Sequence, residues 1–153
     1  MSPPASILIY GYGNPGRQDD GLGVLLVEKI EQWARGVGRT DLVFDSNYQL
    51  NVEDALTISN HDIVIFADAT QTGSDRFAFR PLQPQATISF STHAMTPESV
   101  LALCDELYYK RPSAHLLTIR GYAWEPNAAV TAAAAANLVA AQEFITAWLQ
   151  KQR

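Results

Sequence analysis

Two adjacent carboxylates lie in a glycine-rich loop near the beginning of the chain. The loop Gly11-Tyr-Gly-Asn-Pro-Gly16 follows a short apolar run, and Asp19 and Asp20 come soon after it. A single acidic residue here would simply favour the positive end of the helix that follows. Two carboxylates held between glycines repel each other, because like charges at short range raise the electrostatic energy. The pair therefore indicates a site for a cation.

The same glycines also match a dinucleotide-binding pattern. In that pattern Gly11, Gly13 and Gly16 would let backbone N–H groups approach a pyrophosphate. Pro15 lacks one such N–H group, and the two aspartates would repel phosphate. The acidic residue that ends the next strand, Asp45, also lies further along than the roughly 20 residues that are usual. A nucleotide-binding enzyme nevertheless remains one alternative.

Further polar side chains follow other apolar runs. Asp68 comes after the run at 63–67, and His93 comes shortly after the run at 87–90. In doubly wound α/β folds, sites form at the carboxyl ends of the strands, so Asp20, Asp68 and His93 can converge. Carboxylate and imidazole ligands suit nickel or zinc better than magnesium. Asp68 could instead cap a turn, and His93 could be a partly buried, hydrogen-bonded histidine.

Patterns of other hydrolases are absent from the sequence. There is no G-x-S-x-G elbow, no H-E-x-x-H pair and no phosphate loop ending in G-K-S/T. The sole cysteine, Cys104, lies in a helical pattern where a small buried residue is the ordinary occupant. His61 and His115 lie at the beginnings of strands, at the opposite edge of the sheet, and we expect both to be structural. A serine or cysteine nucleophile is not expected.

Short apolar runs alternate with helical patterns along the chain, which is typical of an α/β domain with a largely parallel sheet. The runs predict strands at 7–10, 42–44, 63–67, 76–82, 87–90 and 115–120, with 76–82 near an edge. Helices are predicted at 21–35, at 51–58 with Asn51 as cap, at 96–109 with Thr96 as cap, and from Asn127 onward. We predict one domain over residues 1–153, a three-layer α/β/α sandwich with a mostly parallel twisted sheet.

Composition narrows the classes of partner. The chain has 153 residues, of which 47% are apolar and 18% charged, as in a folded globular domain. Its net charge is -5 and it has no basic run, so neither nucleic acid nor an anionic membrane is an expected partner. It has no signal-peptide pattern and no apolar stretch near the roughly 18 residues that span a bilayer. We expect a cytoplasmic protein.

Three blocks of the sequence resemble one known family. The stretch IYGYGNPGRQDDGLGVLLVEKI looks like the N-terminal signature of the nickel–iron hydrogenase maturation proteases. The stretches DIVIFADAT and STHAMTPESVLAL are similar to the second and third motifs of that family, in the same order. The segment at 121–126 departs from the family pattern, so the resemblance leaves open which hydrogenase would be served.

The resemblance implies an aspartic-type endopeptidase. Such an enzyme removes the C-terminal extension of a nickel–iron hydrogenase large-subunit precursor once nickel is inserted. By the same resemblance Asp20, Asp68 and His93 would contact nickel supplied by the substrate, and no metal would be permanently bound. We further predict that Asp20 is the catalytic base that takes a proton from the attacking water. A non-catalytic metal-sensing assembly factor is the other alternative.

Overall fold

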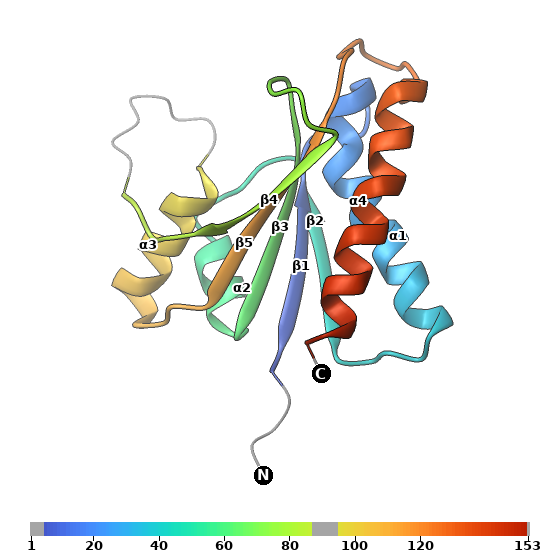
Figure 1. Ribbon diagram of the computed structural model, residues 1–153. Coiled ribbons are helices and arrows are strands. Elements are labelled where there is room, and N and C mark those ends of the chain that lie inside the picture. The colour runs from blue at the N-terminus through green and yellow to red at the C-terminus, as the bar shows by residue number, and fades with distance from the viewer. Residues whose placement is uncertain (1–4, 87–94, 153) are drawn as a thin grey trace.

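A five-stranded sheet forms the middle layer of the computed structural model, which describes residues 5–86 and 95–152 (Figure 1). The strands are β1 (Ile7–Tyr12), β2 (Leu42–Asn47), β3 (Ile63–Thr70), β4 (Phe77–Leu82) and β5 (Ser113–Arg120). Their order is β2-β1-β3-β5-β4. β2, β1, β3 and β5 are parallel, and only β4 runs antiparallel, at one edge. The predicted mostly parallel sheet with an edge strand at 76–82 is confirmed.

Helices cover both faces of this sheet (Figure 1). α1 (Leu22–Gly36) and α4 (Ala132–Gln150) lie on one face, and α2 (Asp54–Ser59) and α3 (Pro97–Tyr108) lie on the other. A short 3-10 helix, η1 (Gln18–Gly21), leads into α1. The three layers confirm the predicted α/β/α sandwich.

Side chains of the central strands alternate between two apolar cores. Ile7 and Ile9 of β1 pack with α1 and α4, whereas Leu8 and Tyr10 pack beneath α2 and α3. All four are essentially inaccessible to solvent. Successive strand residues point to opposite faces, so a strand covered on both sides must be apolar throughout. This is why the short apolar runs predicted strands.

The beginnings of two helices test the predicted caps. The Thr96 side chain accepts a hydrogen bond from the Ser99 N–H, and the Ser99 hydroxyl accepts one from the Thr96 N–H, so the cap of α3 is confirmed. The start predicted for α4 at Asn127 is wrong. Asn127 has a left-handed backbone (φ 58°) that a helix cannot use, and the cap is Thr131, which accepts from the Ala134 N–H.

The start of α2 also differs from the prediction. The helix begins at Asp54, and Asn51 does not cap it. The relation is the reverse, because the Asn51 N–H donates to the Asp54 carboxylate, which also accepts from the Tyr10 hydroxyl. The strand predicted at 87–90 lies outside the described residues. In the part of the chain that is described, no helix is long and apolar enough to cross a membrane.

Candidate active site

The order of the strands defines where a site can form. β1 lies between β2 and β3, so the chain leaves β1 towards one edge and returns across it to β3. At such a switch point a crevice opens beyond the carboxyl ends of the two strands. Asp20 lies in η1, which follows β1, and Asp68 lies near the end of β3. The structure therefore brings these two predicted residues to the same crevice.

Asp20 is partly exposed and its position is fixed by the glycine loop. One of its carboxylate oxygens accepts a hydrogen bond of 2.8 Å from the Asn14 N–H. Gly13 has a φ of 136°, and a Cβ atom there would lie 2.2 Å from the Asp20 carbonyl oxygen. Only glycine permits both this φ and this approach. Gly13 therefore lets the loop fold back and present the Asp20 side chain at the crevice.

A second glycine joins the first helix to β3. A Cβ atom on Gly23 of α1 would lie only 2.3 Å from the Ala67 carbonyl oxygen. The helix and the strand therefore meet backbone to backbone, immediately before Asp68. No other residue type fits this contact without displacing the helix or the strand.

Asp68 is the most perturbed carboxylate of the crevice. Burial raises its pKa to about 7, against the opposing effect of a hydrogen bond of 2.8 Å from the Ala69 N–H. The charge of Asp20 raises it further, and a hydrogen bond with the Tyr12 hydroxyl opposes the rise. Near neutral pH the Asp68 carboxyl is thus poised between its two protonation states. A cation bound between the two carboxylates would relieve their repulsion.

Tyr12 is a residue of the site that sequence reasoning missed. In the register of β1 and β3, Gly11 pairs with Ala67, so Tyr12 lies beside Asp68 on the same face of the sheet. Burial raises the pKa of Tyr12 above its usual value, and the neighbouring Asp68 adds to this effect. The phenol therefore stays protonated and donates to the carboxylate. Tyr12 and Asp68 each lie two positions beyond a buried aromatic residue of their own strand. Residues two apart in a strand point to the same face, so this spacing could have revealed the pair.

The third predicted ligand, His93, lies outside the described residues. Within 5–86 and 95–152, no group of three His, Cys, Asp or Glu side chains could hold a metal ion. The described part of the crevice supplies two carboxylates. Any further ligand has to come from elsewhere in the chain or from the molecule that binds.

Asp19 does not belong to the crevice, although it precedes Asp20 directly. It is fully buried and accepts hydrogen bonds from the Tyr122 and Ala123 N–H groups and from both the N–H and the hydroxyl of Thr131. Burial acts to raise its pKa, but these hydrogen bonds outweigh burial and hold the pKa below its usual value. The expectation that both aspartates face a cation is therefore wrong. Asp19 fixes the beginning of α4.

The loop between β5 and α4 is tied to the glycine loop. The Asn127 N–H donates to the Gly16 carbonyl at 2.9 Å, and the Asp19 N–H donates to the Ala123 carbonyl at 3.1 Å. The Arg17 guanidinium contacts the Trp124 carbonyl at 3.4 Å. The segment at 121–126, which departs from the family pattern in sequence, thus flanks the loop that carries Asp20.

The hydrogen bonds of the glycine loop argue against a phosphate cradle. The Gly13 N–H donates to the Asn47 carbonyl, and the Asn14 N–H donates to Asp20. The Gly16 and Arg17 N–H groups donate to the side chain and the carbonyl of Asn14. Since the intervening residue is proline, every N–H group from 13 to 17 is already engaged within the protein. A pyrophosphate would have to break these bonds.

The remaining candidate residues lie away from the crevice. His61 precedes β3 at the amino edge of the sheet and contacts the Ser6 hydroxyl at 2.7 Å. His115 is the third residue of β5 and stacks on Phe79, with ring centroids 4.6 Å apart. Cys104 is buried in α3, and burial raises the pKa of its thiol, which disfavours the nucleophilic thiolate.

Comparison by sequence gives no relatives. No family model matches the chain. No curated protein matches it either.

Solved structures give several matches. The NiFe hydrogenase maturation protease HycI from Thermococcus kodakarensis is 21% identical, with a TM-score of 0.74 over 97% of this chain and 95% of that one. The hydrogenase maturating endopeptidase HybD from E. coli is also 21% identical, with a TM-score of 0.74 over 95% and 92% of the two chains. A hydrogenase 2 maturation peptidase from a Thaumarchaeota archaeon is 17% identical, with a TM-score of 0.67 over 94% and 97%. The chain therefore has the α/β fold of the hydrogenase maturation proteases.

Proposed function

We propose that this protein is an endopeptidase that removes the C-terminal extension of a nickel–iron hydrogenase large-subunit precursor. The proposal rests on one observation above all: Asp20 and Asp68 meet at the switch-point crevice, where the charge of Asp20 helps to raise the pKa of Asp68. Such a pair favours a divalent cation. The similarity of the fold to hydrogenase maturation proteases supports a hydrogenase precursor as the molecule that would present this cation.

Nickel in the precursor would then act as the recognition element. In this proposal Asp20, Asp68 and His93 complete the coordination of that nickel, and the protein keeps no metal of its own. The positive charge would favour the ionised form of Asp68, whose pKa is otherwise about 7. A precursor without nickel would offer no such compensation, so it would dock poorly. The check on nickel insertion would thus be electrostatic.

Asp20 is our proposed base for the hydrolysis. Its carboxylate would take a proton from water as the water oxygen bonds to the scissile carbonyl carbon. That proton would then pass to the leaving amide nitrogen as the C–N bond breaks, which leaves a new carboxyl and a new amine. The Asn14 N–H holds one Asp20 oxygen and fixes the carboxylate for this role. A cytoplasmic location is part of the same proposal, since Cys104 is a free thiol and suits a reducing compartment.

The test is the intact mass of cognate precursor after incubation with the protein, with and without nickel. We expect a C-terminal segment to be lost only from the nickel-loaded precursor. Asp20→Asn, Asp68→Asn and His93→Ala should each slow the cleavage by about 100-fold or more. The exposed Asp75→Asn serves as the matched control and should cleave at the parent rate. Tight binding of the precursor without any shortening would contradict the proposal and favour an assembly factor.

A further inference from the structure

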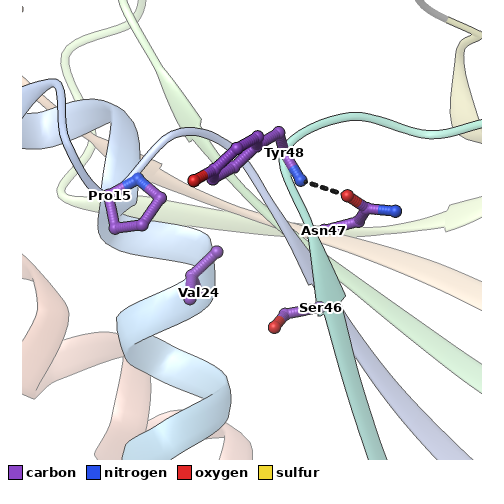
Figure 2. Close-up of a pocket in the computed structure, with 5 residues that line it drawn as sticks. All are labelled: Pro15, Val24, Ser46, Asn47 and Tyr48. Atoms are coloured by element: carbon purple, nitrogen blue, oxygen red, sulfur yellow. Dashed lines mark hydrogen bonds between the residues drawn. The ribbon is translucent and has the colours of Figure 1, made fainter.

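A small pocket lies beside the glycine loop, on the side of α1 (Figure 2). It has a volume of about 240 Å³. Its lining comes from three separate segments, namely the glycine loop, α1, and the end of β2 with the residue that follows it. We call it the Tyr48 pocket, and its lining residues are Pro15, Val24, Ser46, Asn47 and Tyr48.

The lining of the Tyr48 pocket is neutral. The Pro15 ring, the Val24 side chain and the Tyr48 ring supply apolar surface, and Ser46 and Asn47 supply polar groups without charge. The volume is below the roughly 300–1,000 Å³ of pockets that enclose a whole small molecule. The pocket therefore suits one neutral, mainly apolar side chain.

Tyr48 forms an exposed wall of the pocket. It is 69% exposed, although tyrosine usually buries most of its ring in a folded protein. Exposed tyrosines that border a concave surface are enriched where proteins bind one another. The Tyr48 N–H donates to the Asn47 side-chain oxygen at 2.8 Å, which fixes the backbone that carries the ring (Figure 2). The backbone position of this wall is thus fixed before anything binds.

The glycine loop links the Tyr48 pocket to Asp20. Pro15 follows Asn14, whose N–H binds the Asp20 carboxylate, and adjacent Cα atoms lie about 3.8 Å apart. The Gly13 N–H also donates to the Asn47 carbonyl at 3.1 Å, which joins the loop to the end of β2. A polypeptide that places a bond at Asp20 therefore has the pocket within reach of its neighbouring residues.

The free edge of β2 is not arranged to accept a further strand at this point. The Ser46 N–H donates to the Asp45 carboxylate at 2.8 Å, and the Tyr48 N–H is held by Asn47 as described. Both donors are occupied by the side chain of the preceding residue. Strand addition needs such edge donors to be free. A side chain inserted into the pocket is therefore the mode of recognition that this surface favours.

We propose that the Tyr48 pocket binds a neutral apolar side chain of the substrate polypeptide, close to the bond that is cleaved. The inference rests on the proposed endopeptidase function and adds a determinant of specificity to it. Asp20 and Asp68 would recognise the cation, and the Tyr48 pocket would recognise the amino-acid sequence of the substrate polypeptide. A correct metal on a wrong polypeptide would then be rejected.

The test compares binding and cleavage of nickel-loaded precursor by the whole protein and its variants. Tyr48→Ala removes a wall, and Ser46→Phe fills the pocket. Each should raise the Kd for the precursor about tenfold, as loss of one well-packed contact does. Tyr109→Asn removes an exposed tyrosine from the end of α3, and asparagine tolerates the left-handed backbone there, so this control should bind as the parent does.

A specificity exchange makes the test sharper. Ser46→Asp places a carboxylate in the pocket, so it should improve cleavage of a precursor in which lysine replaces the apolar residue, relative to the parent protein. Normal cleavage with unchanged Kd in Tyr48→Ala and Ser46→Phe would overturn the pocket alone. Weaker binding in these variants without any cleavage by the parent would overturn the endopeptidase function alone. A parent that neither binds nor cleaves the precursor would overturn both.

Discussion

Two carboxylates, the buried Asp19 and the half-buried Asp68, differ sharply in how the protein compensates their charge. Asp19 accepts four hydrogen bonds from the loop before α4 and from Thr131, and its pKa is held below the usual value. Asp68 has the Ala69 N–H and the Tyr12 hydroxyl, faces the charge of Asp20, and has a pKa of about 7. The first is a fully satisfied structural anchor. The second is left under-compensated, as groups reserved for a ligand often are.

Removal of the anchor should give the largest effect on stability. Asp19→Ala leaves three N–H groups and one hydroxyl without their acceptor inside the protein, which should cost about 3–5 kcal/mol of the free energy of unfolding. Urea unfolding measures this loss. Glu106→Ala, at an exposed position of α3, is the control and should change little. Equal losses in the two variants would show that Asp19 is not an anchor.

Removal of the Asp68 charge should stabilise the protein, in contrast to the loss of Asp19. The folded-state pKa of Asp68 is raised, so the stability that it contributes is present at acidic pH and is lost as pH rises towards 7. The Asp68→Asn side chain cannot ionise. The free energy of unfolding of this variant, relative to that of the parent protein, should therefore rise by about 2–4 kcal/mol from pH 4 to pH 8. Thermal unfolding at both pH values measures the change. A difference that does not vary with pH would contradict the raised pKa.

A smaller loss of stability should distinguish the hydrogen bond between Thr131 and Asp19 from an ordinary helix cap. Thr131→Val removes both the cap of α4 and one hydrogen bond to Asp19, whereas Thr96→Val removes only the cap of α3. We expect a loss of about 1–2 kcal/mol for Thr131→Val and a smaller loss for Thr96→Val. A double-mutant cycle with Asp19→Asn should show coupling. Additive losses would place Thr131 and Asp19 in separate roles.

The smallest effects concern the pKa of Asp68 itself. Asp20→Asn removes a neighbouring negative charge and should lower that pKa, whereas Tyr12→Phe removes a donor to the carboxylate and should raise it. Carboxyl-carbon NMR titration of the two variants follows the Asp68 resonance directly. Shifts in the same direction would contradict the arrangement of the crevice.

The sequence was a good guide to the elements and to part of the site. Apolar runs with flanking turns predict strands because central parallel strands are buried on both faces, as β1 and β3 are. Asp20 and Asp68 could be placed together because Asp20 follows β1 and Asp68 lies near the end of β3, and these strands meet at one switch point. The shared fold with hydrogenase maturation proteases agrees with the resemblance carried by the same motifs.

Long-range pairing limited the rest of the prediction. The donors to Asp19 lie more than 100 residues further along the chain, so local pattern could not distinguish it from Asp20. The same contact moves the beginning of α4 to Ala132, because Thr131 is held by Asp19 as it caps the helix. Tyr12 was missed for a related reason, since its partner lies on another strand.

The contact between Gly23 and Ala67 has a mechanical consequence. Because main chain touches main chain there, no side chain separates α1 from β3 at that point. The segment that carries Asp20 leads directly into α1, and Asp68 directly follows Ala67. Both carboxylates are therefore attached to elements that are in close backbone contact. This contact restricts changes in the distance between the Asp20 and Asp68 carboxylates. In the proposed function, a cation would meet two carboxylates whose spacing the fold has already set, and the chain that carries the cation would have to adjust to them.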